Sequence, residues 1–174
     1  MIEKMAERIA LTMKRINPDE TASVEVMKFS LSLLINLMAI TTLSLAIGAL
    51  TGKFSETLLV LVSIAILRQV SGGIHLKTSE ACVIFSTLAV VAIPHLPINE
   101  KWCIILTTVS AVLVLIFAPS RIEEQTRIPR KYWPLLKMIS FLIVSSNFLF
   151  QSGILACAFF LQSVGLIRKI QIRK

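Results

Sequence analysis

Charge is scarce in this sequence, and so are aromatic residues, glycine and cysteine. Of its 174 residues 16% are charged and 7% aromatic, with six glycines and three cysteines. A soluble domain carries about 25% charged residues, so a soluble globular protein is excluded. The sequence also lacks the strict apolar–polar alternation of an outer-membrane barrel. Long charge-free apolar runs and a mean hydropathy of +0.80 predict a small all-α polytopic membrane protein instead.

The net charge of +8, from 18 Lys and Arg against 10 Asp and Glu, has two interpretations. Nucleic-acid binders combine basic residues with interleaved aromatics on one surface. This pattern is missing, so we expect no nucleic-acid partner. Cytoplasmic loops of membrane proteins also collect Lys and Arg, and this is the interpretation that the apolar runs favour.

The chain predicts one integral membrane domain over 1–174. Its parts are an interfacial N-terminal region (1–28), a transmembrane bundle (29–167) and a basic cytoplasmic tail (168–174). A helix needs about 20 residues to cross a bilayer. The predicted spans are 29–50, 54–70, 81–99, 102–120 and a hairpin of two short helices within 132–167, turning near Gln151–Gly153. The arrangement therefore has about six spans.

Within the N-terminal region, residues 1–16 place Ile2, Met5 and Ile9 on one face of a helix. A basic amphipathic helix of this kind suits the anionic surface of a bilayer. Asn17, followed by Pro18 and Glu20, has the spacing of a helix start. We therefore expect the second helix to begin there and to continue into the membrane.

The distribution of cations predicts the orientation. With six spans, every Lys and Arg except Lys53 and Lys101 falls on the side of the two termini. The positive-inside rule then places both termini and the loops 68–80 and 120–137 in the cytoplasm. We expect a multi-pass protein of the cell membrane.

Two of the three cysteines and one of the two histidines have a structural interpretation. Cys157 lies inside the last apolar run, and Cys103 lies near His95 with little else polar around them. Buried cysteines are mostly inert. His75 and His95 fall on opposite sides of the predicted membrane, so we expect no metal site, and no Gly-rich phosphate loop suggests a cofactor.

Cys82 and His75 differ from these residues because they share one cytoplasmic segment. Thr78 or Ser79 can cap the helix that follows, which puts Cys82 in or just past its first turn. A helix N-terminus favours the nucleophilic thiolate, although Glu80 opposes this. The segment is therefore a candidate Cys/His site.

The spacing limits how such a dyad can form. Seven residues of continuous helix rise about 10.5 Å, whereas a base must come within about 3 Å of its nucleophile. The chain must therefore fold back before Thr78, and Gly72-Gly73 permits this. The same glycines are also explained if they only end the preceding helix.

A non-enzymatic membrane protein is the alternative, either a peptide transporter or a scaffold in which Cys82 is structural. Transport paths usually carry charged groups deep in the membrane. Here the deepest polar residues are uncharged, and they are Asn36, Asn147, Gln151 and Gln162. An ion-coupled transporter is therefore disfavoured.

The pattern Arg68-x-x-Ser71-Gly72-Gly73-x-His75-x6-Cys82 resembles the accessory gene regulator B family of membrane endopeptidases. The similarity extends to the short multi-span chain and to Ala118-Pro119 before a basic loop. The resemblance implies a cysteine endopeptidase that removes the C-terminal tail of a small quorum-sensing propeptide. Cys82 would be the nucleophile and His75 the general base. A thioester acyl-enzyme then leads to a cyclic thiolactone or lactone peptide, and a homodimer is implied.

The resemblance also implies a substrate with an amphipathic leader and an acidic tail. The helix over 1–16 and the basic loop 120–137 would be suitable neighbours for these two parts. The expected substrate-binding residues are Arg68, Gly72, Gly73, Arg127, Arg130 and Lys131. The alternative for these cations is simpler, because topology alone explains the loop and snorkelling explains Arg68.

Overall fold

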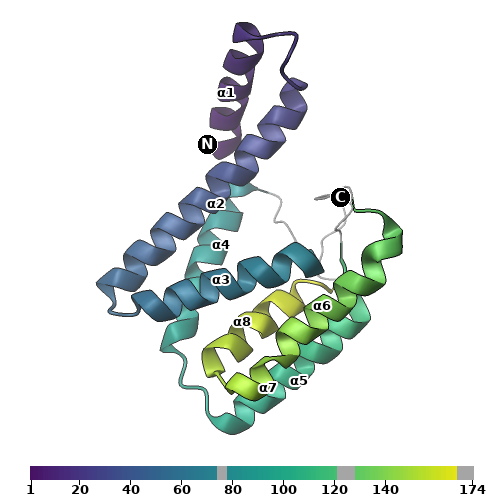
Figure 1. Cartoon of the computed structure of the whole chain (residues 1–174). Coiled ribbons are helices and arrows are strands. Elements are labelled where there is room, and N and C mark those ends of the chain that lie inside the picture. The colour runs from purple at the N-terminus through teal and green to yellow at the C-terminus, as the bar shows by residue number, and fades with distance from the viewer. Residues whose placement is uncertain (74–77, 121–127, 168–174) are drawn as a thin grey trace.

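A computed structural model describes residues 1–73, 78–120 and 128–167, and within these ranges the chain forms helices and no strand. Figure 1 shows their arrangement. The helices are α1 (Ile2–Ile16), α2 (Val24–Leu50), α3 (Phe54–Ser71), α4 (Ser79–Ala92), η1 (Ile93–His95), α5 (Glu100–Phe117), η3 (Arg130–Tyr132), α6 (Trp133–Ser145), α7 (Asn147–Phe150) and α8 (Gly153–Val164). The predicted all-α class is therefore confirmed.

Four segments in the described part of the chain are long and apolar enough to cross a membrane. They are α2, α3, α5 and the run Arg130–Phe150. The helical stretch Ser79–His95 and α8 are apolar but shorter. The structure thus supports a membrane protein with four candidate spans, and the six-span arrangement and its orientation stay predictions.

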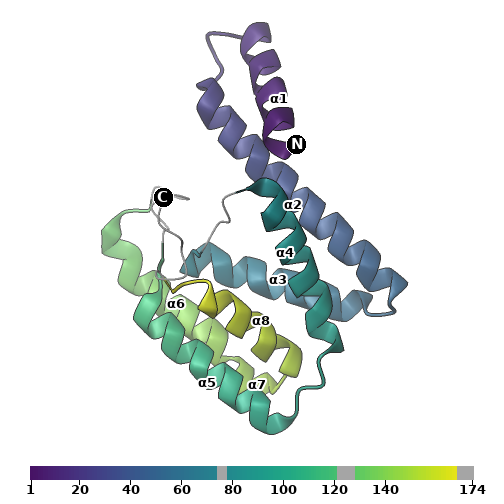
Figure 2. The ribbon, with the colours of Figure 1, turned by 180° about the vertical axis from the view of Figure 1, so that it is seen from behind.

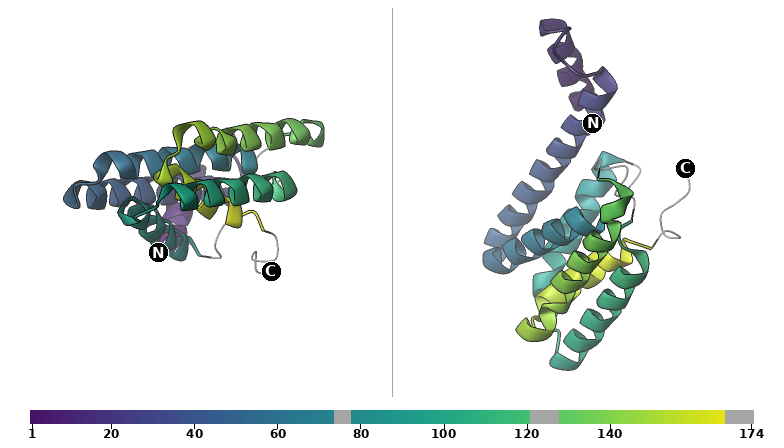
Figure 3. Two further views of the ribbon diagram at one scale, coloured as in Figure 1. Left: turned by 90° about the horizontal axis from the view of Figure 1, so that it is seen from below. Right: turned by 45° about the vertical axis from the view of Figure 1, so that its right-hand side comes forward.

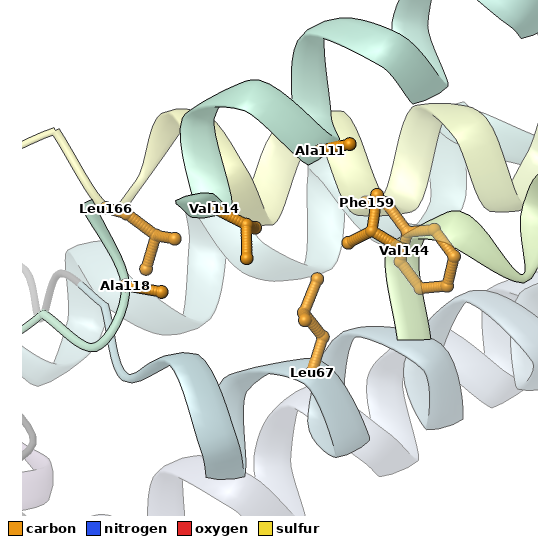
Figure 4. Packing of buried hydrophobic residues seen from close by; sticks show 7 residues of the cluster. All are labelled: Leu67, Ala111, Val114, Ala118, Val144, Phe159 and Leu166. Atoms are coloured by element: carbon orange, nitrogen blue, oxygen red, sulfur yellow. The ribbon is translucent and has the colours of Figure 1, made fainter. Parts of the chain in front are cut away.

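Four helices enclose the main core. Both α6 and α8 pack against α3 and α5. Leu67, Val114, Val144 and Phe159 meet at the centre (Figure 4). Lipid tails are as apolar as these side chains, so close packing rather than removal from water stabilises the bundle. Small residues at the contacts, such as Ala111 and Ala118, permit this close approach.

The N-terminal helices lie outside this core. α1 runs antiparallel to the first half of α2 and projects beyond the other helices (Figures 1 and 3). Lys28 and Glu7 form an ion pair of 2.9 Å between them. α4 packs on α2 on the face that Figure 2 shows. The helix predicted over 1–16 is present, and its contact with a membrane surface stays a prediction.

The predicted start of the second helix at Asn17 is wrong. The side-chain amide of Asn17 donates to the Glu20 carboxylate at 2.9 Å, so the expected partners do meet. They close a local turn instead, since short polar side chains stabilise turns as readily as helix starts. α2 begins after Ser23, whose hydroxyl accepts from the Val26 N–H at 3.4 Å.

The reversal predicted near Gln151–Gly153 is confirmed, and a buried amide closes it. Gln151 adopts a left-handed conformation with φ +49° between α7 and α8. The Asn147 side chain donates to Thr107 Oγ1 at 2.9 Å and to the Ser152 carbonyl at 3.1 Å. Its own oxygen accepts from the Ser152 N–H at 3.1 Å. The reversal is therefore fastened to α5.

Candidate active site

The end of α3 carries the first half of the predicted motif. α3 ends at Ser71, and the Gly72 N–H donates to the Arg68 carbonyl at 2.9 Å. Gly72 has φ +73° and Gly73 φ +140°, both in a region that side chains with a Cβ rarely adopt. The preceding helix therefore ends at this glycine pair, and the fold-back that a Cys/His dyad requires stays a prediction.

The glycine pair lies against the segment 118–120, which the sequence resemblance also singled out. Gly72 and Ser120 form a short parallel bridge. The Gly73 N–H donates to the Ser120 carbonyl at 3.0 Å, and the Ser120 N–H donates to the Ser71 carbonyl at 2.9 Å. A Cβ on Gly72 would lie 2.1 Å from the Ser120 carbonyl oxygen. Only glycine therefore fits this position.

A third element, α8, reaches the same turn through Gln162. Its amide nitrogen donates to the Gly72 carbonyl at 2.7 Å and to Ser71 Oγ at 3.3 Å. Ser120 and Gln162 are site-forming residues that motif reasoning missed. The available signal is a glutamine inside an otherwise apolar helix, a feature that is also compatible with a transport path.

Cys82 lies at the start of α4, as the sequence predicts. Thr78 caps this helix, since its hydroxyl accepts from the Ala81 N–H at 3.3 Å. The Cys82 N–H donates to the Thr78 carbonyl at 3.1 Å, so Cys82 belongs to the first helical turn. Cys82 is a free cysteine, and the residue is partly exposed, unlike the two other cysteines.

Arg68 and Cys82 come from different helices and lie within electrostatic range of each other. Arg68 belongs to the last turn of α3 and Cys82 to the first turn of α4. This interaction joins the end of α3 to the start of α4, the two described elements that carry predicted site residues.

The carboxylate of Glu80 is engaged by the start of α1. It accepts from the Ile2 N–H at 3.1 Å and is paired with the amino group of Met1. The hydrogen bond from that amino group, with smaller contributions from backbone N–H groups, lowers the pKa of Glu80 to about 2. Glu80 therefore stays ionised around neutral pH and links α1 to α4 near Cys82.

Of the remaining predicted residues, His75, Arg127 and the basic tail 168–174 lie outside the described part of the chain. Arg130 and Lys131 are exposed in η3, where the Arg130 guanidinium lies over the Trp133 ring at 5.4 Å and the Lys131 ammonium over the Tyr132 ring at 4.9 Å. They precede Trp133, which lines an open cavity of about 370 Å³. Its lining residues are Ile116, Phe117, Ala118, Pro119, Trp133, Pro134 and Lys137.

The other two cysteines are buried. Cys103 is 3% exposed and Cys157 is 8% exposed, and the Cys103 sulfur lies 3.6 Å from the Asn147 amide nitrogen. Their packing agrees with the structural role predicted for them. Among the described residues, His, Cys, Asp and Glu form no cluster of three suited to a metal ion.

An all-helical fold with four helices able to cross a bilayer defines the class as helical membrane proteins. Within this class, residues 2–171 match the family Accessory gene regulator B. The match covers nearly the whole chain, so the protein belongs to the accessory gene regulator B family, which takes part in quorum sensing. No solved structure matches the chain.

Two relatives support this assignment. The chain is 32% identical over 115 residues to an AgrB-like protein of Halalkalibacterium halodurans, covering 66% of this chain and 58% of the relative. It is 29% identical over 139 residues to the accessory gene regulator protein B of Staphylococcus intermedius, covering 75% of this chain and 72% of that protein. The aligned part thus spans less than two thirds of the first relative.

Proposed function

We propose that the protein is a membrane cysteine endopeptidase that removes the C-terminal tail of a small quorum-sensing propeptide on the cytoplasmic side of the membrane. Cys82 is the nucleophile and His75 its general base. The observation that carries the proposal is the placement of a free, partly exposed Cys82 in the first turn of α4. The charge of Arg68 lies within electrostatic range of it.

The first step is attack of the Cys82 thiolate on a backbone carbonyl of the propeptide. His75 takes the thiol proton, a C–S bond forms and the peptide C–N bond breaks. The departing amine receives the proton back from the His75 imidazolium. The tail leaves with a new amino terminus, and the rest of the peptide stays on Cys82 as a thioester.

The second step closes the ring. A Cys or Ser side chain inside the bound peptide attacks the thioester carbonyl, and the bond to Cys82 breaks. A new thiolactone or lactone bond forms, and the proton from the attacking group restores the Cys82 thiol. The thioester retains acyl activation only if water is excluded. A site at the headgroup boundary, beside the apolar helices α3 and α8, suits this requirement.

Substrate binding is proposed for Arg68, Arg127, Arg130 and Lys131. The Arg68 guanidinium has donors for the scissile carbonyl or a carboxylate. Arg130 and Lys131, with Arg127, attract the acidic tail, and Gly72-Gly73 form the adjacent turn. The support for this is that Arg130 and Lys131 are exposed just before Trp133, which lines the 370 Å³ cavity together with Ala118 and Pro119. The α1 helix, linked to Glu80, is a neighbour for an amphipathic leader.

Proteoliposomes that hold the full chain can test the proposal. They are incubated with the peptide of a neighbouring reading frame that has an amphipathic start and an acidic end. Mass spectrometry should detect the released tail and a peptide adduct on Cys82 that hydroxylamine removes. Cys82→Ala and His75→Ala should abolish tail release, whereas Cys103→Ala, the matched control, should keep it.

Tail release by the Cys82→Ala protein would contradict the proposal. So would transfer of the intact peptide across the bilayer without any cleavage, since this is the behaviour of a transporter in which Cys82 only packs.

A further inference from the structure

A buried glutamine is unusual in a helix as apolar as α8. Gln162 is 6% exposed, and a buried amide without hydrogen-bond partners is costly. Both hydrogens of its amide nitrogen are used, one on the Gly72 carbonyl at 2.7 Å and one on Ser71 Oγ at 3.3 Å. The chain therefore retains this polar group to bind the turn that ends α3.

The turn is held from two sides. On one side the backbone of Ser120 pairs with Ser71 and Gly73. On the other side Gln162 binds the Gly72 carbonyl. Gly73 passes so close to α8 that a Cβ there would lie 3.1 Å from the Gln162 amide nitrogen. Because contacts on both sides restrain it, the backbone at 71–73 has one defined direction.

This direction bears on the candidate dyad. The segment that carries His75 starts from Gly73 and ends at Thr78, which caps α4. A continuous helix over that segment would put His75 about 10.5 Å along the axis from Cys82. A dyad therefore requires the chain to leave α3 in a direction other than that of a continuing helix, and the turn at 71–73 is where this direction is set.

We propose that Gln162 is a positioning residue for the reaction: its amide holds the Gly72 carbonyl and so fixes the direction in which the chain leaves α3, on which the proposed action of His75 on Cys82 depends. This inference rests on the proposed function. Gln162 contacts the backbone of the turn and acts through it. Motif matching does not find such a residue, since Gln162 lies 80 positions after Cys82 in the sequence.

The first experiment compares Gln162→Met with Asn147→Leu in proteoliposomes. Both variants replace a buried amide with an apolar side chain of similar size, but the amide of Asn147 binds Thr107 and Ser152, away from the glycine turn. Gln162→Met should lower kcat for tail release at least about tenfold with little change in KM, because a small misplacement of a base costs rate. Asn147→Leu should keep the kcat of the folded protein.

The second readout is the coupling between His75 and Cys82. Cys103 and Cys157 are replaced by Ala, and the alkylation rate of Cys82 is followed against pH with and without His75→Ala. In the parent chain His75→Ala should change the rate profile. In the Gln162→Met chain it should have no further effect, because the imidazole no longer approaches the thiol. A purely structural residue would leave this coupling intact in the folded fraction.

Gln162→Asn provides a second variant if Gln162→Met does not fold. It keeps the amide but shortens the side chain by one methylene, so the hydrogen bond to Gly72 is lost while a polar group remains. The same loss of coupling is expected.

Wild-type kcat and unchanged coupling in a folded Gln162 variant would overturn the inference. If Cys82→Ala is inactive in the same assay, wild-type behaviour of the Gln162 variant overturns only the inference about Gln162, and the proposed function is unaffected. If Cys82→Ala still releases the tail, the proposed function itself fails, and the inference fails with it.

Discussion

Asn147 and Gln162 are two buried amides near opposite ends of α5, and their partners differ in kind. Asn147 binds the Thr107 hydroxyl and both backbone groups of Ser152, which closes the short reversal between α7 and α8. Gln162 binds the Gly72 carbonyl of a turn that leads toward Cys82. The same chemical group thus closes a helix connection in one place and orients a candidate active-site segment in the other.

The connections between helices differ in the same way. One group of connections, which we call the turn end, consists of the links 51–53, 96–99 and 151–152. Here short turns join helices that follow each other in the sequence. At the site end, defined by 71–73, 78–82 and 118–120, distant parts of the chain meet. Substitutions at the turn end should therefore change stability, and those at the site end should change reactivity.

The largest expected effect comes from a matched pair of glycines. Gly72 and Gly52 have nearly the same φ, +73° and +69°, but a Cβ meets the Ser120 carbonyl oxygen at Gly72 and nothing within 4 Å at Gly52. Gly72→Ala should reduce tail release about 100-fold, because a backbone clash displaces the turn. Gly52→Ala should cost about 1 kcal/mol of unfolding free energy from backbone strain and leave activity unchanged.

Both quantities can be measured on purified protein, with tail release in liposomes and unfolding in detergent. Equal activity loss in the two variants would show that strain in a left-handed residue, and not the contact with Ser120, accounts for the effect.

A moderate effect is expected at the turn end. Asn147→Leu removes the hydrogen bonds of the Asn147 amide to Cys103, Thr107 and Ser152, and leaves Ser152 without its side-chain partner. The free energy of unfolding should fall by about 1–3 kcal/mol, the usual cost of unsatisfied buried groups. Denaturant titration followed by circular dichroism measures this loss. A denaturation midpoint equal to that of the wild-type protein would mean that the hydrogen bonds closing the reversal between α7 and α8 contribute nothing to stability.

The smallest effect is expected from the two helix caps. Thr78 caps α4 at the site end, and Ser152 caps α8 at the turn end. Each substitution by Ala should cost about 1 kcal/mol of unfolding free energy. Only Thr78→Ala should also alter the alkylation rate of Cys82, because it frays the turn that holds the thiol. Equal Cys82 alkylation rates in the two variants would show that the reactivity of Cys82 does not depend on the Thr78 cap of α4.

Local signals predicted much of the fold and part of the candidate site. The break at Gly72-Gly73 and the cap at Thr78 follow from residues within a few positions of each other, and both are present. The start of α2 was predicted wrongly at Asn17, because a capping pair and a polar turn use the same side chains. Helix length and hydropathy predicted about six spans, of which four are long enough in the described part of the chain, and gave no packing partners.

The long-range contacts could not be predicted in this way. Ser120 pairs with the glycine turn from nearly fifty positions away, and Gln162 does so from ninety. Nothing in the neighbourhood of either residue indicates a partner. A backbone bridge depends on where two helices end in space, which tertiary packing determines.

The most direct test of the site is the alkylation of Cys82 against pH in the Cys103→Ala/Cys157→Ala chain, with and without His75→Ala. We predict that removing His75 changes the dependence of the Cys82 alkylation rate on pH. A profile that is the same with and without His75 would contradict a Cys82–His75 dyad.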